Sequence, residues 1–392
     1  MTPSRRRVTP DERRARLGRR HLLAGSTRVR TPEEVAAALI GLHATDPATV
    51  FLSAAARMSD PGVPAVERAL YEERTLARIR CLRRTMFVLP AALAPVVQAA
   101  VGRDAYMDRA RAMARLRDAA GWDELRCSAA EQDVLALLAE RVEVTAAEFA
   151  DAVPDLREQI TTSPGKPYES RQRVASTVLG VLAAEGRIRR ARPAGGWTSA
   201  QFRWAGAEPL PELPASEARA ALARLYLSAF GPVTESDLKW WTGWTLTATR
   251  KAIATVGAEA VGLDEGTGYL LAEDVEPVCD PDPWVALLPG LDPTSMGWRG
   301  RDWYLDPSYT PELFDRNGNI GPTVWADGRV IGAWAQRPDG SINHRLLTDP
   351  GHEARTALDR EIARMTDFLG DTRVTPCYRT PLERRLSAQP VG

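Results

Sequence analysis

The sequence predicts a mainly α-helical chain with small β-hairpins, an α+β class: three tandem winged helix-turn-helix units and a small C-terminal antiparallel β domain. The first observation behind this prediction is a repeat. A helix, a short helix, a third helix and a hairpin begin at Ser128, and the same order begins again at Ser216. The second observation is that the N-terminal segment fits this order. The third is a change to strand patterns from about residue 282.

The first unit is assigned to residues 1–125. Its second helix opens with a capping box of Thr31 and Glu34, with Pro32 at the first helical position, and two strand patterns, "LARIR" and "RTMFVLP", predict its wing. Helices are predicted over residues 11–23, 31–42, 47–58 and 64–74. Most winged helices bind nucleic acid, although many serve as protein-interaction modules.

The second unit is assigned to residues 126–208 and the third to residues 209–281. The run "ESRQRVASTVLGVLAAEG" is predicted to be the recognition helix of the second unit, with a hairpin of "RIRRARP" and "WTSAQFRWA" after it. Capping boxes are predicted for two helices of this unit: Ser128 with Glu131, and Thr145 with Glu148. Three tryptophans are expected to fill the core of the third unit: Trp240, Trp241 and Trp244.

The C-terminal domain is assigned to residues 282–392. Strand patterns with Asp-Gly turns at Asp327 and Asp339 predict antiparallel pairs, and the run "GHEARTALDREIARMTDFLG" predicts a helix after them. We therefore expect a small sheet domain at the end of the chain.

The charged residues are unevenly distributed, although 51 basic and 51 acidic residues cancel overall. Residues 1–90 contain 17 arginines and 9 acidic residues, and residues 157–204 contain 9 basic and 3 acidic residues. Acidic residues predominate over residues 205–300. This distribution suits a protein that contacts a polyanion with particular surfaces.

The composition is that of an ordinary globular protein, with 44% hydrophobic and 26% charged residues. No apolar run approaches the roughly 18 residues of a membrane helix, and the basic N-terminal segment lacks the apolar stretch of a secretory signal. Four widely separated cysteines predict reduced thiols, without a disulfide framework or a zinc site: Cys81, Cys127, Cys279 and Cys377. We expect a cytoplasmic protein with no membrane partner and no metal.

Four segments together resemble one known family: "GLHATDPATVFLSAAAR", "RTMFVLP", "LLPGLDPTSMGWRGR" and "PTVWADGRVIGAW". With the three predicted winged helices, they resemble the winged-helix DNA-binding family that includes the azinomycin-resistance (AlkZ-like) DNA glycosylases, over nearly the whole chain. The resemblance implies a monofunctional enzyme that removes bulky N7-alkylguanines from double-stranded DNA, including those in interstrand crosslinks, without a cofactor. Because no coiled-coil heptads are present for a dimer, we expect a monomer.

The resemblance also implies a catalytic pair. Family members hold the catalytic water with a Gln-x-Gln or Gln-x-Asp motif, and His43 and Thr45 occupy these positions here. A neutral histidine can accept the water's proton, and a threonine hydroxyl can accept or donate a hydrogen bond. With an ordinary histidine pKa, the excision rate would fall with a midpoint near pH 6.5. The alternative is that His43 is a partly buried histidine that caps the preceding helix.

Asp46 is the only carboxylate in this segment. Because a proline follows it at the start of a predicted helix, Asp46 is expected to be the N-cap, worth about 1 kcal/mol. An electrostatic role toward the reacting sugar is the alternative.

Six arginines are candidates for phosphate contact: Arg83, Arg84, Arg171, Arg173, Arg299 and Arg301. The first pair precedes a wing strand, the second begins the predicted recognition helix, and the third lies beside Trp298 and Trp303 in "GWRGRDW". The alternatives are solvated surface arginines and tryptophans that anchor a loop on the sheet.

Two hypotheses follow. The first is a monofunctional DNA glycosylase, and the second is a non-catalytic winged-helix DNA-binding protein, either a regulator or a lesion-binding factor. The family pattern favours the first, and the replacement of the glutamine motif by His43 and Thr45 favours the second. No phosphate loop, dinucleotide fingerprint or metalloprotease motif is present in the sequence.

Overall fold

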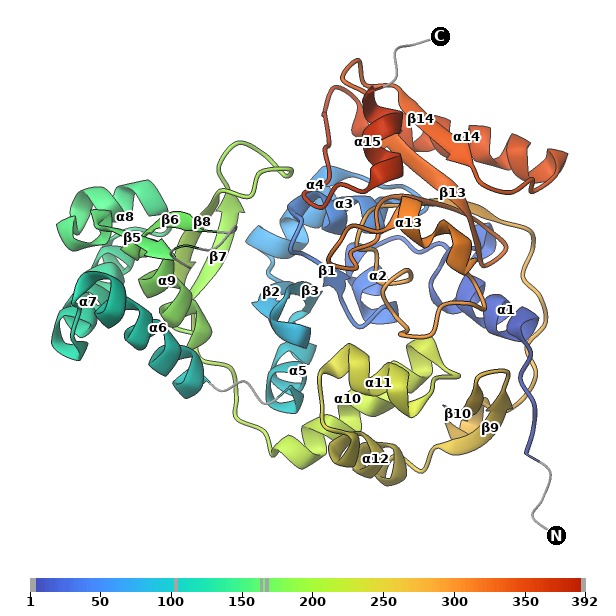
Figure 1. Cartoon of the computed structure of the whole chain (residues 1–392), viewed down its shortest axis with the longest axis horizontal. Coiled ribbons are helices and arrows are strands. Elements are labelled where there is room, and N and C mark those ends of the chain that lie inside the picture. The colour runs from blue at the N-terminus through green and yellow to red at the C-terminus, as the bar shows by residue number, and fades with distance from the viewer. Residues whose placement is uncertain (1–4, 102–104, 163–164, 166–168, 389–392) are drawn as a thin grey trace. The chain divides into compact units, whose positions relative to one another are not determined.

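The structure, a computed structural model, describes residues 5–101, 105–162, 165 and 169–388. Its contacts divide the chain into two units (Figure 1). Unit 1 contains residues 1–101 and 213–392, and unit 2 contains residues 102–212. Within the described ranges, no helix combines the length and the apolar character needed to cross a membrane.

Unit 2 combines helices with small antiparallel sheets. Its helices are α6 (Ala105–Ala120), α7 (Glu124–Glu140), α8 (Ala146–Ala152) and α9 (Val174–Ala184). One sheet has the order β4 (Val144–Thr145), β8 (Phe202–Gly206), β7 (Ile188–Pro193), and a separate hairpin pairs β5 (Gln159–Thr162) with β6 (Ser170–Arg173). Helix α6 packs against α9, and Leu116 and Trp122 join the core of this unit. The prediction assigned this segment, up to residue 125, to the first unit, because a helical pattern does not indicate which core the helix joins.

Helix α7 begins earlier than predicted. The Asp123 side chain accepts the N–H of Arg126 at 2.8 Å and caps the helix at Glu124. Ser128 therefore lies inside the helix, and the predicted capping box of Ser128 and Glu131 is wrong.

The predicted recognition helix begins later than its pattern indicated. Residues 170–173 form strand β6, and α9 begins at Val174. Arg171 and Arg173 therefore lie on an exposed strand instead of the first turn of the helix. The prediction was wrong because these residues pair with β5, a non-local contact that helical periodicity does not reveal.

Unit 1 begins with the N-terminal helices and a three-stranded sheet of order β1-β3-β2. The elements are α1 (Pro10–Arg20), α2 (Pro32–Ala38), β1 (Leu42–His43), α3 (Pro47–Ala55), α4 (Val63–Glu67), β2 (Leu76–Arg80), β3 (Met86–Pro90) and α5 (Ala94–Ala100). After unit 2 the chain continues with α10 (Ala215–Phe230), α11 (Glu235–Thr242), α12 (Leu246–Thr255), β9 (Glu259–Leu263) and β10 (Gly266–Leu270).

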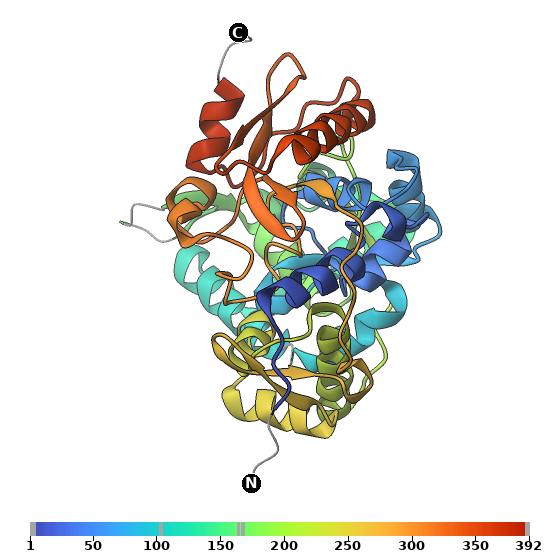
Figure 2. The same cartoon turned by 90° about the vertical axis from the view of Figure 1, so that its right-hand side faces the viewer.

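The C-terminal part of unit 1 is a four-stranded antiparallel sheet with helices. The strands follow the order β11 (Val285–Leu288), β12 (Thr323–Ala326), β13 (Arg329–Gln336) and β14 (Ile342–Leu346), and the helices are α13 (Thr310–Leu313), α14 (His352–Leu369) and α15 (Pro381–Ala388). The predicted turns at Asp327 and Asp339 connect consecutive strands. Figures 1 and 2 show this sheet at one end of unit 1 and α10–α12 at the other, with the N-terminal helices between them.

Helix α2 ends before its predicted boundary at Leu42. Ile40 and Gly41 have φ values of 61° and 143°, which end the helix and reverse the chain. A Cβ on Gly41 would lie 3.0 Å from the carbonyl oxygen of Val88, so this close approach requires glycine. The next two residues become strand β1 and pair with β3.

The predicted caps and core tryptophans are partly confirmed. The capping boxes of Thr31 with Glu34 and of Thr145 with Glu148 are present. Trp241 and Trp244 are buried as expected, whereas Trp240 is half-exposed. Adjacent residues on a helix point about 100° apart, so Trp240 and Trp241 could not both face one core.

The coarse fold class, helices with small antiparallel sheets, is confirmed. The order helix, helix, helix, hairpin is present in α7–α8–α9 with β7 and β8, and in α10–α11–α12 with β9 and β10. The assignment of three winged-helix units remains a prediction that this order supports.

Candidate active site

The segment "HATDP" forms the bend between strand β1 and helix α3. His43 pairs with Phe87 of β3, and the centroids of their rings lie 5.0 Å apart. The N–H of Thr45 donates to Nδ1 of His43 at 3.5 Å, and the N–H of Met86 donates to Oγ1 of Thr45 at 3.4 Å. The two residues that the resemblance selected therefore lie together, both supported by β3.

The His43 side chain is uncharged at neutral pH. It is only 4% exposed. Burial, and secondarily the positive charge of Arg83, lower the pKa of His43 to about 4. The ring is therefore neutral at pH 7, and a neutral ring that accepts at Nδ1 carries its proton on Nε2. The alternative that His43 caps the preceding helix is wrong, because α2 ends at Ala38 and His43 belongs to a strand.

Asp46 is the N-cap of α3, as predicted. One carboxylate oxygen accepts the N–H of Ala48 at 3.1 Å, and the other accepts the N–H of Cys377 at 2.8 Å. Burial raises the pKa of Asp46, and these hydrogen bonds partly oppose the shift. Both oxygens are engaged in holding the backbone, which favours the cap over an electrostatic role toward DNA. The contact with Cys377 joins α3 to the C-terminal segment, and sequence reasoning missed it.

We expect the Asp46→Ala variant to lose about 2 kcal/mol of unfolding free energy, about half from the cap and half from the Cys377 contact. Asp46→Asn should lose about half as much, because its amide has a single oxygen for two backbone donors. Thermal unfolding measures both losses. Asp123→Ala is the matched control in unit 2, because Asp123 caps α7 with one hydrogen bond. Equal losses for the alanine variants at positions 46 and 123 would show that the Cys377 contact adds nothing.

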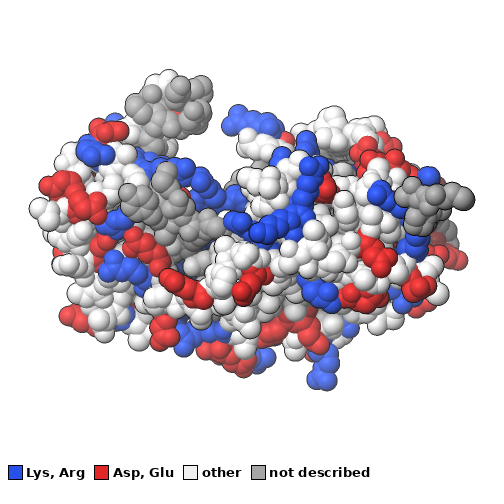
Figure 3. Space-filling view, turned by 90° about the horizontal axis from the view of Figure 1, so that it is seen from below, with Lys and Arg blue, Asp and Glu red and all other residues white. Residues whose placement is uncertain are grey.

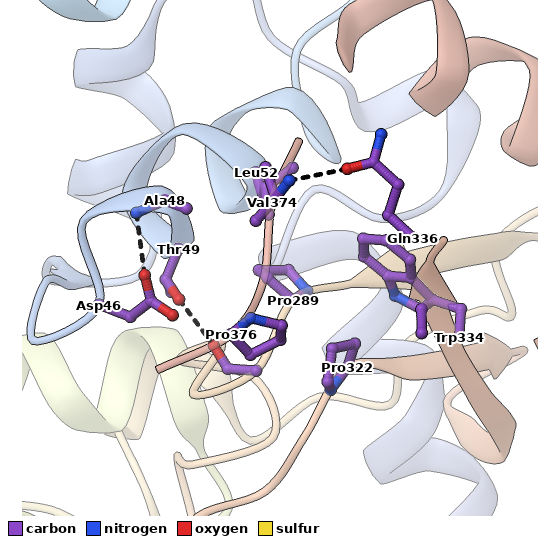
Figure 4. Close-up of a pocket in the computed structure, with 12 residues that line it drawn as sticks. Asp46, Ala48, Thr49, Leu52, Pro289, Pro322, Trp334, Gln336, Val374 and Pro376 are labelled. Atoms are coloured by element: carbon purple, nitrogen blue, oxygen red, sulfur yellow. Dashed lines mark hydrogen bonds between the residues drawn. The ribbon is translucent and has the colours of Figure 1, made fainter. Parts of the chain in front are cut away.

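A small cavity adjoins Asp46, as Figure 4 shows. Its volume of about 20 Å³ is close to that of one water-sized probe and much too small for a nucleotide. Thr49 approaches it from α3 and donates to the carbonyl of Gly290 at 2.8 Å, and on the opposite wall Gln336 accepts the N–H of Val374 at 2.8 Å. This cavity is a packing feature beneath the site.

A buried ion pair fixes the other end of α3. Arg57 and Asp292 are both fully buried, and Nη2 of Arg57 lies 2.7 Å from the Asp292 carboxylate. Ser53 donates to the same carboxylate at 2.6 Å, and Arg57 donates to Oγ1 of Thr294 at 2.8 Å. The pair joins "FLSAAAR" to "GLDPT", two of the segments that carried the resemblance. Sequence reasoning missed it, although a single arginine in an otherwise apolar helix signals a buried partner.

The six candidate arginines are divided between the units. In unit 1, Arg83 and Arg301 both lie over the ring of Trp240, with guanidinium carbons 4.1 Å and 5.3 Å from its centroid. Arg84 and Arg299 are exposed in the same unit. Arg171 and Arg173, on β6, are exposed in unit 2.

The glycine-rich loop is anchored by its tryptophans. Trp298 is buried and donates to the carbonyl of Phe230 at 3.1 Å, and Trp303 is buried beneath the guanidinium of Arg13. The two tryptophans therefore anchor the loop that presents Arg299 and Arg301, but their contacts are with α10 and α1 and not, as the alternative expected, with the sheet.

The surface also carries an open cleft of about 1060 Å³ in unit 1. Its lining includes Arg299 and Arg301 together with Arg316 and Arg329, but also several carboxylates, among them Asp302. Figure 3 shows one face of the molecule, with Lys and Arg side chains in blue and Asp and Glu side chains in red. Among the described residues, no group of three or more His, Cys, Asp or Glu side chains is placed to hold a metal ion.

Comparison with known proteins identifies the family. The family model described as "DNA glycosylase AlkZ-like" matches residues 36–368, most of the chain. The chain belongs to this family. The matched range includes His43, Thr45, Arg83 and Arg301, so the AlkZ-like family model covers the site described above.

Two relatives from Streptomyces sahachiroi are similar to this AlkZ-like chain. An "interstrand DNA cross-link repair glycosylase" is 31% identical over 170 residues, which are 40% of this chain and 44% of that protein. The aligned part thus spans less than half the length of that relative. The solved structure of "DNA glycosylase AlkZ" matches with a TM-score of 0.68 and 20% identity, over 94% of this chain and 98% of that chain. At this identity the structural match shows a shared fold.

Proposed function

We propose that this AlkZ-like protein is a monofunctional DNA glycosylase that hydrolyses the N-glycosidic bond of N7-alkylguanine in double-stranded DNA and acts as a monomer. The observation that carries the proposal is the contact of a neutral, buried His43 with the backbone N–H of Thr45, at the two positions that correspond to the family's catalytic motif. The relative described as a cross-link repair glycosylase extends the proposal to crosslinked guanines.

The proposed reaction needs little catalytic assistance from the protein. An N7-alkylguanine is already cationic, so the base leaves without being protonated. What remains is to orient a water molecule and to stabilise a sugar that resembles an oxocarbenium ion. His43 can donate its Nε2–H to the water, and the Thr45 hydroxyl can accept from it, so the pair orients the water without a metal or a cofactor. Arg84, Arg171, Arg173 and Arg299 are proposed as further phosphate contacts, because they are exposed.

The non-catalytic alternative is less well supported. It required that the changed motif had lost its function, but His43 and Thr45 lie together with polar atoms that a water molecule could use. Family membership over most of the chain also favours the enzyme.

The test is excision by the wild-type protein. We expect incubation with a duplex that carries one N7-methylguanine to produce an abasic site, detected as strand cleavage after alkali, faster than in a protein-free control. Without alkali the strand should stay intact, because a monofunctional glycosylase does not cut the backbone. Binding of the duplex without excision above the control rate would support the non-catalytic protein instead.

A further inference from the structure

Two arginines, Arg83 and Arg301, form an arginine pair at the ring of Trp240. Arg83 comes from the turn between β2 and β3, Trp240 from α11, and Arg301 from the glycine-rich loop. The guanidinium of Arg301 also lies 5.2 Å from the ring centroid of Phe314. Aromatic faces thus fix the position of both cations.

The arginine pair lacks the negative partners that other half-buried or buried arginines of unit 1 have. Arg13, Arg16 and Arg57 each form an ion pair, with distances of 2.5 Å, 2.9 Å and 2.7 Å to Glu265, Glu12 and Asp292. Among the residues that the structure describes, neither Arg83 nor Arg301 forms an ion pair, and the Nε of each is buried without a hydrogen-bond acceptor.

Asp237, on the same helix as Trp240, has its carboxylate engaged elsewhere. Oδ1 of Asp237 accepts the backbone N–H groups of Arg299 and Gly300 at 2.9 Å and 3.1 Å, and its Oδ2 accepts the N–H and the hydroxyl of Thr234. Asp237 therefore holds the loop and caps α11, and both of its oxygens are occupied.

The two cations oppose each other, and the backbone beneath one of them is strained. Burial, and then the positive charge of Arg301, lower the pKa of Arg83 to about 10. Arg83 and Arg84 have φ values of 48° and 62°, a left-handed conformation that costs roughly 1–2 kcal/mol for a residue other than glycine. Unpaired cations held close together on a strained turn are a costly arrangement in the free protein, and an anion between them would relieve the repulsion.

We propose that Arg83 and Arg301 together bind one backbone phosphate of DNA, at or next to the nucleotide whose base is removed. The proposal rests on the glycosylase function proposed above. A phosphodiester offers two free oxygens to two planar guanidinium forks. Stacking of a base on this face of Trp240 is less favourable, because Arg83 already covers the ring.

The place of this phosphate relative to the reaction follows from electrostatics. Arg83 lies in the turn that leads into β3, the strand that pairs with His43, and its positive charge acts on the His43 ring. A bound phosphate would offset this charge, so the pKa of His43 should be higher in the DNA complex than in the free protein.

The test combines protein and DNA variants. Duplexes with a central tetrahydrofuran abasic analogue carry one uncharged methylphosphonate, placed at each phosphate around the analogue in turn. At one position we expect the affinity of the wild type to fall on the order of 10-fold, the value of one charge-assisted contact. For the Arg83→Gln/Arg301→Gln variant, the methylphosphonate at that position should lower the affinity little. At every other position, the affinities of the wild type and of this variant should fall by the same factor.

A charge-matched control is Arg360→Gln, because Arg360 is exposed on α14, at the opposite end of unit 1 from α11 in Figure 1. This variant should keep the wild-type pattern. The Arg83→Lys/Arg301→Lys variant keeps both charges but loses the planar guanidinium groups. Its loss of affinity at the same position should therefore lie between the losses of the wild type and of the glutamine variant. If the glutamine variant unfolds, the lysine variant decides: a smaller loss than the wild type at that position alone supports the proposal.

Equal losses for the wild type and the pair variants at every position would overturn the phosphate site. Failure of the proposed function gives a different result. In that case the position-specific difference is present, but no N7-methylguanine is excised. A wild type that binds none of the duplexes would overturn both.

Discussion

Arg57→Met is expected to lower the free energy of unfolding by about 3–5 kcal/mol and the melting temperature of unit 1 by roughly 10 °C. Asp292 is fully buried, and its carboxylate contacts Arg57, Ser53 and the N–H of Thr294. Burial alone would raise the pKa of Asp292, but the charge and hydrogen bonds of Arg57 hold it below the ordinary value. Without Arg57 the carboxylate must either remain charged without a partner or take up a proton.

The control removes a pair of the same type at the surface. Asp264→Asn breaks the ion pair of Arg7 and Asp264, whose side chains are 71% and 51% exposed, and should cost less than about 1 kcal/mol. Arg57→Met/Asp292→Leu should recover part of the loss, because no buried charge is then left unpaired. Denaturant and thermal unfolding measure these differences. Unchanged stability of Arg57→Met would show that α3 and the loop that follows β11 are held by other contacts.

The ion pair of Arg57 and Asp292 could not be predicted from the sequence, because it is not a local interaction. Local signals worked where the interaction is local: the capping boxes at Thr31 and Thr145 and the N-cap at Asp46 involve residues within one helical turn. The Asp-Gly turns of the C-terminal sheet were found for the same reason. Arg57 and Asp292 are separated by most of the chain, and no pattern in either segment names the other as its partner.

The errors have the same origin. Residues 170–173 fit a helical pattern but pair with β5, and Leu42 fits the end of a helix but pairs with β3. In both cases a strand partner far along the chain overrides local propensity. Trp240 was assigned to the core by its residue type alone, whereas its neighbour Trp241 occupies that direction of α11.

The candidate site was predicted by resemblance more than by chemistry. The motif placed His43 and Thr45, but its local pattern could not show that His43 is buried, because that depends on Phe87 and Arg83 in another part of the chain. The midpoint near pH 6.5 that was expected for the fall of the excision rate therefore changes. With a pKa of about 4, His43 stays neutral over the whole physiological range.

His43→Ala is expected to lower the single-turnover excision of N7-methylguanine on the order of 10²–10⁴-fold, with DNA affinity nearly intact. The ring is proposed to act on the attacking water, and the base leaves readily, so binding should not depend on this side chain. Two further variants distinguish the roles of the two ring nitrogens. Asparagine places its amide near the Nδ1 position, where it can accept the N–H of Thr45, and glutamine reaches the Nε2 position. We expect His43→Gln to recover part of the rate and His43→Asn to recover little.

The pH profile provides an independent check. Because burial disfavours the charged ring, the neutral form persists to lower pH, and the protein-dependent rate should fall only as the pH drops through about 4. The rate is measured after subtraction of the uncatalysed loss of the base at each pH. A midpoint near the ordinary histidine value would contradict a buried, neutral His43 as the titrating group, because Arg83 is the smaller cause of the shift and its neutralisation by a phosphate would raise the midpoint only in part. If His43→Ala excises at the wild-type rate at every pH, the water is held by another side chain, and Thr45 is the next residue to replace.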